Sequence, residues 1–189
     1  MKKEGIIGDL FFKKNGTKAQ VWVETVTYTL IAFVMIGLVL SFAKPKIEEY
    51  QDKIITEQSV KMLKEIDLII SEVSEEGIGN KRKIELGLKK GSIEIIPEND
   101  SLIFTMKTRH IYSEPEEKYV EGALTILTKE KGTFNDLTMR MNYSSIYNIT
   151  FDLKESSKTI SSSPTPYNVF ISNNGNDGGD LKVINFQID

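Results

Sequence analysis

The chain has 189 residues, contains no cysteine and carries a formal net charge of -3. The lack of cysteine excludes disulfides and thiolate metal sites, and a small net charge without a long basic run argues against nucleic-acid binding. Charged residues make up 27% of the chain and apolar residues 40%, which is compatible with one folded domain and an additional segment.

The charge is unevenly distributed. The first 19 residues hold five lysines and two acidic residues, whereas the rest of the chain has an excess of six acidic residues. An apolar run separates the two parts. This order is typical of a chain that enters a membrane with its N-terminus in the cytoplasm.

The apolar run covers residues 20–43. No residue in 25–43 is charged, and Val21, Trp22 and Val23 extend the run past Glu24. About 20 apolar residues in a helix span roughly 30 Å of hydrocarbon. Because the run is apolar on all sides, it is predicted to span a membrane rather than to lie on a surface or in a core. The alternative is a secretory signal peptide cleaved after Ala43, although the apolar part of such peptides is usually shorter.

The junction before this run reads Lys18-Ala19-Gln20-Val21-Trp22-Val23-Glu24. It resembles the class III signal peptide of archaeal type IV pilins, in which a basic and a small residue precede the cut and glutamate is fifth in the mature chain. The resemblance implies that residues 1–19 are a leader and that a prepilin peptidase cuts between Ala19 and Gln20. Glycine is the commoner residue before the cut, so Ala19 departs from the usual pattern.

Glu24 is the one charged residue within the apolar run. After cleavage, the ammonium group of Gln20 would lie one helical turn before it, and the helix dipole favours an anion there by roughly 0.3–1 kcal/mol. In the family this glutamate pairs with the N-terminal ammonium of its own or a neighbouring subunit. The resemblance therefore implies an assembly role for Gln20 and Glu24. The other interpretation is that Glu24 marks the edge of the span and its carboxylate reaches water.

Lys44-Pro45-Lys46 ends the apolar run, and Pro45 is predicted to kink the helix without ending it. Spacings of three and four then predict an amphipathic helix over 46–76, completing one long helix over 20–76 that Gly77 and Gly79 would end. Its apolar face would pack on the C-terminal domain. With one polar member, Gln58, this face consists of Ile47, Tyr50, Ile54, Gln58, Met62, Ile66, Ile69 and Val73. A separate coiled-coil stalk is the alternative.

Residues 77–189 change to an alternating pattern, which predicts an antiparallel β-rich globular domain and an α+β fold. Lys90-Gly91 is predicted to form a hairpin turn between strands at 84–88 and 93–95, and residues 98–100 a turn before a strand at 102–106. Further strands are predicted over 119–128, 134–143, 146–153, 167–171 and 181–188, and a Ser- and Pro-rich loop over 156–166.

Three Asn-x-Ser/Thr sequons lie in this domain. If the domain is exported, Asn99, Asn142 and Asn148 are candidate N-glycosylation acceptors, and Asn99 is the best because it lies in a predicted turn. His110 is the only histidine and has no nucleophile beside it in the sequence. The Asn- and Asp-rich run 173–180 lacks the terminal glutamate of a calcium loop. We therefore expect no catalytic residue, no metal and no cofactor, and predict that the chain is not an enzyme.

The resemblance implies a structural subunit of an archaeal type IV pilus-like extracellular filament that serves adhesion. Its partners would be copies of itself or other pilins, the prepilin peptidase, the membrane platform for pilus assembly, and membrane lipid before assembly. The precursor would cross the membrane once, with its N-terminus in the cytoplasm, and the mature chain would lie in the filament on the cell surface. The alternatives are an uncleaved single-pass membrane protein with a β-rich binding ectodomain, and an archaellum subunit used for swimming.

Overall fold

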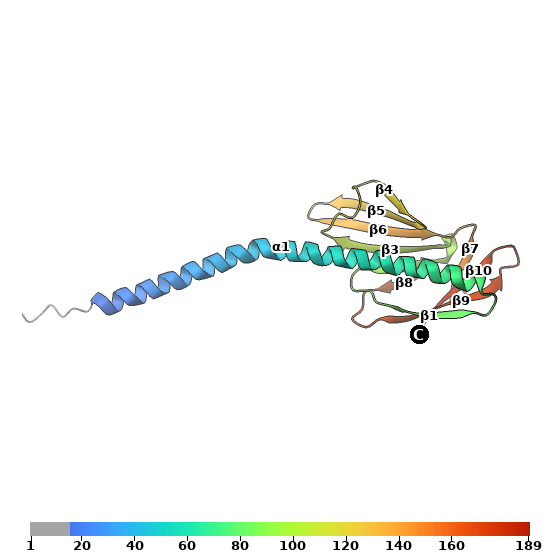
Figure 1. Ribbon diagram of the computed structural model, residues 1–189, viewed down its shortest axis with the longest axis horizontal. Helices are drawn as coiled ribbons and strands as arrows, with labels where there is room; N and C mark the ends of the chain where they lie inside the picture. The colour runs from blue at the N-terminus through green and yellow to red at the C-terminus, as the bar shows by residue number, and fades with distance from the viewer. Residues whose placement is uncertain (1–15) are drawn as a thin grey trace, which may run out of the picture. The chain divides into compact units, whose positions relative to one another are not determined.

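The computed structural model describes the backbone of residues 16–189 and the side chains from Val21 onward. Within this range, one helix, α1 (Gly16–Glu75), is followed by ten strands and a short 3-10 helix, η1 (Pro97–Asn99) (Figure 1). The chain divides into two units, Met1–Lys46 and Ile47–Asp189. One long N-terminal helix before a β-rich domain confirms the predicted α+β fold.

α1 continues through Pro45, as the sequence predicted. A proline inside a helix removes one backbone donor and crowds the carbonyl four residues earlier, so it weakens the helix locally without having to end it. The kink predicted at Pro45 stays a prediction. The helix ends at Glu75, just before Gly77, where the Asn80 side chain donates to the Glu76 carbonyl at 2.6 Å.

The second unit contains two sheets. Neighbouring strands are antiparallel except β7 and β10, which run parallel. The four-stranded sheet has the order β1 (Lys81–Leu86), β9 (Tyr167–Asn176), β10 (Lys182–Ile188) and β7 (Tyr147–Phe151). The six-stranded sheet has the order β4 (Lys118–Glu121), β5 (Leu124–Lys131), β6 (Phe134–Asn142), β3 (Ser101–Thr108), β2 (Ser92–Ile96) and β8 (Lys158–Ser161).

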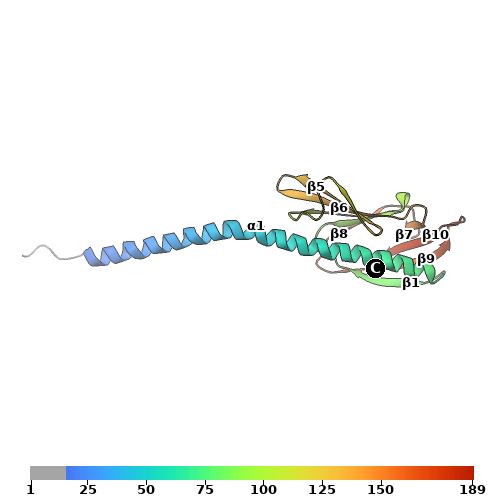
Figure 2. The same cartoon turned by 45° about the horizontal axis from the view of Figure 1, so that its top comes forward.

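The two sheets and the second half of α1 share one core. Alternate residues of the strands point inward, as in β3, where Leu102, Phe104 and Met106 are buried. The residues of α1 that join this core recur at helical spacing and are Val60, Leu63, Ile66 and Ile70. Figure 2 shows this half of α1 running beside strands of both sheets.

Leu63→Ala is expected to lower the free energy of unfolding by about 2–5 kcal/mol, because Leu63 is completely buried and its truncation leaves a cavity. Urea denaturation of the full chain in detergent would measure this loss. The matched control is Leu68→Ala on the same helix, where the side chain is 58% exposed and a change within about 0.5 kcal/mol is expected. Equal losses for both variants would contradict the placement of this helix on the domain.

The hairpin predicted at Lys90-Gly91 is wrong. β1 pairs with β9, whereas β2 pairs with β3 and β8, so the strands on either side of Gly91 belong to different sheets. Gly91 has a φ of 86°, and a Cβ atom there would lie 2.4 Å from the Thr105 carbonyl oxygen. The glycine therefore serves a close crossing past β3 rather than a hairpin.

Three other strand predictions also differ from the structure. The strand predicted over 119–128 is two strands, β4 and β5, which pair with each other. The loop predicted over 156–166 contains β8, which adds to the edge of the six-stranded sheet beside β2. β9 extends to Asn176, past the predicted end of this strand at residue 171 and into the Asn-rich run. In each case pairing with another strand decides the local structure.

The buried face of α1 differs from the predicted one over its first turns in the second unit. Ile47, Tyr50 and Ile54 are exposed, whereas Asp52 and Thr56 are buried. Further along, Ile66 and Val73 are buried as predicted. The physical reason is that the β-domain presents polar groups to this part of the helix, so the polar face of the helix packs against the domain.

Candidate functional site on the N-terminal helix

The apolar segment of α1 is fully exposed. None of the membrane-length window in the described helix is buried, and Trp22 and Phe42 are 70% and 76% exposed. The helix is long and apolar enough to cross a membrane. It is therefore compatible with a membrane anchor or a signal sequence near the N-terminus.

Three threonines near the start of this segment satisfy their hydroxyl groups within the helix. Thr25, Thr27 and Thr29 each donate to the carbonyl four residues earlier, at 2.8–2.9 Å. This pattern removes the need for water around the hydroxyl groups. The threonines are therefore compatible with an apolar environment such as lipid or packed helices.

Glu24 lies on the exposed helix without an ion-pair partner among the described residues. Its Oε1 accepts a hydrogen bond from the Tyr28 hydroxyl, one turn later, at the long distance of 3.4 Å. A carboxylate in apolar surroundings is costly unless it is paired. Glu24 thus needs water or a cation that the described part of the chain does not supply.

The predicted cleavage junction lies at the limit of the described residues. The backbone of Lys18, Ala19 and Gln20 belongs to α1, and their side chains lie outside the described ones. The pairing of Gln20 with Glu24 and the cut after Ala19 stay predictions, as does the leader over 1–19. The Ala19–Gln20 bond lies within the helical range of α1, Gly16–Glu75.

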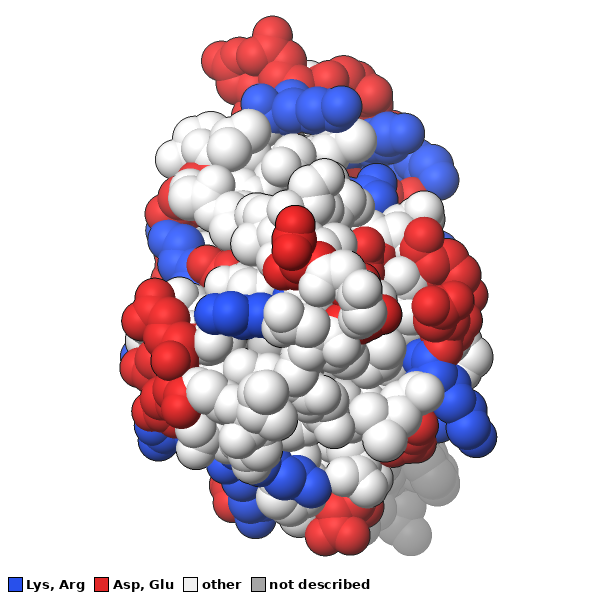
Figure 3. Space-filling view, turned by 90° about the vertical axis from the view of Figure 1, so that its right-hand side faces the viewer, with Lys and Arg blue, Asp and Glu red and all other residues white. Residues whose placement is uncertain are grey.

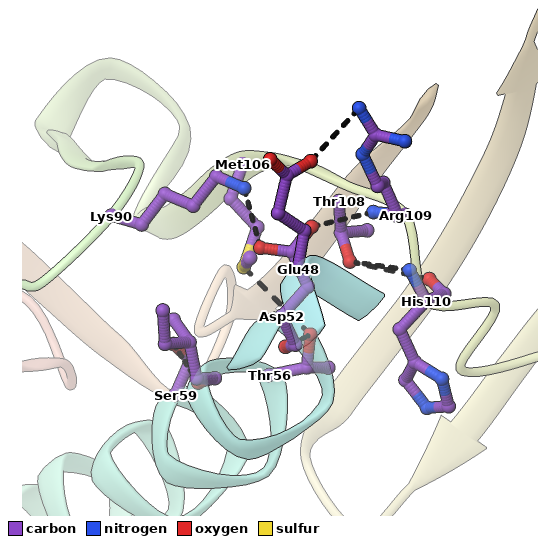
Figure 4. Close-up of polar contacts among 10 residues, drawn as sticks. Glu48, Asp52, Thr56, Ser59, Lys90, Met106, Thr108, Arg109 and His110 are labelled. Atoms are coloured by element: carbon purple, nitrogen blue, oxygen red, sulfur yellow. Dashed lines mark hydrogen bonds and ion pairs between the residues drawn. The ribbon is translucent and has the colours of Figure 1, made fainter. Parts of the chain in front are cut away.

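A buried carboxylate fastens the helix to the β-domain beyond Pro45 (Figure 4). The Asp52 side chain is 7% exposed, and its Oδ1 accepts from Lys90 Nζ at 2.5 Å. Its Oδ2 accepts from the backbone N–H of Arg109 at 2.7 Å. We call Asp52, Lys90, Arg109 and Glu48 the Asp52 cluster. It joins α1 to the segment before β2 and to the end of β3.

Arg109 has three roles in this cluster. Its guanidinium pairs with Glu48 Oε2 at 2.9 Å and lies over the Phe134 ring, 4.6 Å from the ring centre. Its backbone N–H holds Asp52, as described above. The sequence did not indicate this cluster, because Asp52 is 38 and 57 residues from its two partners. The contacts are structural, and His110 beside them donates its backbone N–H to Thr108 Oγ1.

Asp52→Ala is expected to lower the free energy of unfolding by about 1–3 kcal/mol, because it leaves the Arg109 N–H and the Lys90 ammonium without their partner. Lys90 is 35% exposed, so water offsets part of the loss. The control is Lys53→Ala, whose pair with Glu57 is long, at 4.0 Å, and exposed, and which is expected to cost less than about 0.5 kcal/mol. Urea denaturation of both variants tests this, and equal losses would contradict the role of Asp52.

The Asn-rich run closes the end of α1. Asn173 is buried, and its Nδ2 donates to the carbonyls of Val73 and Ser74 at 3.3 and 3.4 Å. Lys182 Nζ donates to the same Ser74 carbonyl at 2.8 Å. The last carbonyls of a helix lack partners within it, so these side chains supply them. Among residues 21–189, no group of three His, Asp or Glu side chains could hold a metal ion.

The three sequons lie in different local structures. Asn99 is the last residue of η1, Asn142 is the last residue of β6, and Asn148 is inside β7. The structure brings the first two together, because the Ser144 hydroxyl lies 2.9 Å from the Asn99 carbonyl oxygen.

The surface at the right-hand side of Figure 1 mixes both signs of charge. Figure 3 shows lysine and arginine side chains interspersed with aspartate and glutamate, with uncharged surface between them. A nucleic-acid surface would gather basic side chains on one face. This face has no such patch.

Comparisons with protein-family models, with curated proteins and with solved structures give no significant match. The fold and the helix define a class of protein: a β-rich domain that follows one long, exposed, apolar N-terminal helix.

Proposed function

We propose that the chain is the precursor of a type IV pilin-like subunit, which is cleaved between Ala19 and Gln20 and assembles through α1 into an extracellular filament. The observation that carries this proposal is an apolar surface on α1 beyond the membrane-length segment. Ile47, Tyr50 and Ile54 are 55%, 68% and 53% exposed. Their spacings of three and four residues place them on one face of the helix, which we call the outer stripe.

The outer stripe supports a filament subunit over a simple membrane anchor. It follows Lys44-Pro45-Lys46, whose charges favour a position outside the hydrocarbon. In an anchored monomer the stripe would remain in water. In a filament, neighbouring helices would cover it, and each half-exposed side chain would contribute roughly 1 kcal/mol on burial. Exposed apolar surface of this kind is typical of an interaction site.

Glu24 has a chemical role in the proposed assembly. Packing of apolar helices would remove water from its carboxylate, which has only the long hydrogen bond from Tyr28 among the described contacts. Cleavage before Gln20 creates an ammonium group near the start of the same helix. A pair between this ammonium and Glu24 of the same or a neighbouring subunit would offset the cost of burial.

The β-rich domain would form the outer surface of the filament and supply its adhesive function. The partners in this proposal are copies of the chain or other pilins, the prepilin peptidase and the membrane assembly platform, with lipid around the span before assembly. The chain acts by packing and binding in this proposal, without enzymatic activity.

Intact mass and N-terminal sequencing of the native protein test the proposal. A chain that starts at Gln20 and is found in sheared filaments under the electron microscope would support it. A start at Lys44 would indicate an ordinary signal peptidase, and a start at Met1 an uncleaved single-pass protein with a binding ectodomain. Either result would overturn the proposal. Filaments that are needed for swimming would instead identify an archaellum subunit.

A further inference from the structure

We infer that the folded domain presents one N-glycosylation site, Asn142, and that the other two sequons, at Asn99 and Asn148, are not modified. The inference rests on the export of the domain that the proposed function requires. It concerns a different surface from the outer stripe, so the two can fail separately.

Both residues of the Asn142 sequon lie on the surface, and the Ser144 hydroxyl also lies 2.9 Å from the Asn99 carbonyl oxygen. Asn142 and Ser144 are both exposed, at the end of β6 and in the turn after it. The backbone N–H of Ser144 donates to Asn142 Oδ1 at 3.3 Å, and the Ser144 hydroxyl lies 2.8 Å from the same oxygen. A backbone N–H can only donate, which identifies the facing atom as oxygen. The Asn142 nitrogen is therefore left for a reaction.

The turn that carries this sequon is anchored by the buried residue between the two sequon positions. Tyr143, between the two sequon residues, is buried, and its hydroxyl donates to Asp67 Oδ1 at 2.9 Å. Burial, followed by the charge of Asp67, raises the pKa of the Tyr143 phenol, so it stays a neutral donor. The Tyr143 N–H donates to the Asp100 carbonyl, and Ile146 N–H to the Tyr143 carbonyl, both at 2.8 Å. These contacts fix the backbone of the turn, and the Asn142 and Ser144 side chains stay exposed on it.

In the Asn99 sequon the asparagine is exposed, but the residue that carries the hydroxyl group is buried. Asn99 is exposed, but Ser101 is completely buried at the start of β3. The Ser101 hydroxyl accepts a hydrogen bond from the Arg140 guanidinium at 3.4 Å. Since a sequon is defined by both its asparagine and its hydroxyl residue, an enzyme must contact both. In the folded domain an enzyme cannot reach the Ser101 hydroxyl, so Asn99 is not a suitable acceptor, although the sequence alone indicated it as the best candidate.

The Asn148 sequon is engaged at both ends. Asn148 pairs with Val183 inside β7, and its Nδ2 donates to Asp177 Oδ2 at 3.4 Å. Thr150 is buried, and its hydroxyl donates to Asn185 Oδ1 at 3.1 Å. Modification here would require β7 to leave its sheet.

The reaction needs a sugar donor outside the chain. The chemical class that fits is an oligosaccharide joined through its anomeric carbon to a phosphate or pyrophosphate on a membrane lipid. Asn142 Nδ2 loses one proton to a base of the transferase and forms a bond to the anomeric carbon. The bond between that carbon and the phosphate oxygen breaks, and its electron pair leaves with the phosphate.

The position of the glycan is compatible with filament assembly. Tyr143 beside it contacts Asp67, which is 13 residues after Ile54 on α1. At 1.5 Å per residue this places the sequon roughly 20 Å along the helix from the outer stripe. A bulky, hydrophilic group there would cover the end of the six-stranded sheet around η1 and leave the stripe free.

Glycopeptide mass spectrometry of the protein from its own cells tests this inference. Asn99 lies in the tryptic peptide 91–107, whereas Asn142 and Asn148 share the peptide 141–154, so fragmentation that preserves the glycan must separate them. We expect a glycan on Asn142 only. A glycan on Asn99 or Asn148 would overturn the inference, as would an unmodified Asn142 in a domain that protease added to whole cells can digest.

The intact mass of sequon variants of the protein provides a second test of the same inference. Asn142→Gln and Ser144→Ala are expected to lose the glycan mass, whereas Ser144→Thr, Asn99→Gln and Asn148→Gln are expected to keep it. A glycan that survives Ser144→Ala would contradict the assignment. Filaments built from unglycosylated chains that start at Gln20 would overturn this inference alone and leave the proposed function intact.

Discussion

Replacing Glu24 by glutamine is expected to reduce the yield of assembled filament at least about tenfold, while cleavage after Ala19 continues. Glutamine has nearly the same shape but no charge, so the ammonium of Gln20 would enter the packed helices without its counter-ion. A loss of about 1.4 kcal/mol per subunit contact already gives a tenfold change in the equilibrium constant, and an unpaired buried charge costs more. The measurement compares the subunit in sheared filaments with the subunit left in membranes.

The matched control for this prediction is Glu57→Gln. Glu57 lies on the same helix but is 58% exposed, and its pair with Lys53 is long, at 4.0 Å. Normal filament yield is expected for this variant. If Glu24→Gln also assembles normally, the carboxylate has no role in assembly. If it blocks removal of residues 1–19 instead, Glu24 acts in recognition by the peptidase.

The arrangement of elements along the chain was largely predictable because it depends on local patterns. A long charge-free run and the spacing of apolar residues predicted one helix, which the structure confirms over Gly16–Glu75. Alternation around Leu102, Phe104 and Met106 predicted a strand, and these three residues are the buried side of β3. Both periods follow directly from backbone geometry.

The pairing of the strands was not predictable in the same way. Gly91 was interpreted as a hairpin residue because Lys-Gly between two apolar runs is a common turn signal. Its actual role depends on the Thr105 carbonyl, which only the folded sheet places beside it. β8 was missed because it lies in a Ser- and Pro-rich stretch that resembles a loop, and it becomes a strand by pairing with β2.

The Asp52 cluster explains why apolar spacing gave the wrong buried face at the start of the second unit. Apolar periodicity assumes that the domain offers an apolar surface to the helix. Here the domain offers Lys90 and the Arg109 N–H, which Asp52 satisfies. Turning Asp52 inward turns Ile54 outward, since two residues along a helix correspond to about 200° of rotation. The outer stripe is thus a consequence of contacts of the buried Asp52 carboxylate that the sequence did not indicate.

Ile54→Glu is expected to prevent filament assembly while the free energy of unfolding of the β-domain changes by less than about 1 kcal/mol. Ile54 is 53% exposed on the side of α1 away from Asp52, so the folded monomer accommodates a charge there. Between packed apolar helices the same charge would cost about 2.5–3.5 kcal/mol or more, which is a loss of roughly a hundredfold in the assembly equilibrium. Filament yield and urea denaturation of the full chain in detergent measure the two effects separately.

The control for this variant is Ile111→Glu, which makes the same change at a side chain that is 48% exposed in the segment between β3 and β4. It adds the same charge to the β-domain and is expected to leave assembly within about twofold of the parent protein, because a surface charge of this kind is screened by water and salt. Equal defects in both variants would indicate a general effect of charge. Normal assembly of Ile54→Glu would mean that the outer stripe faces water in the filament, and the stripe would then no longer support the proposed assembly.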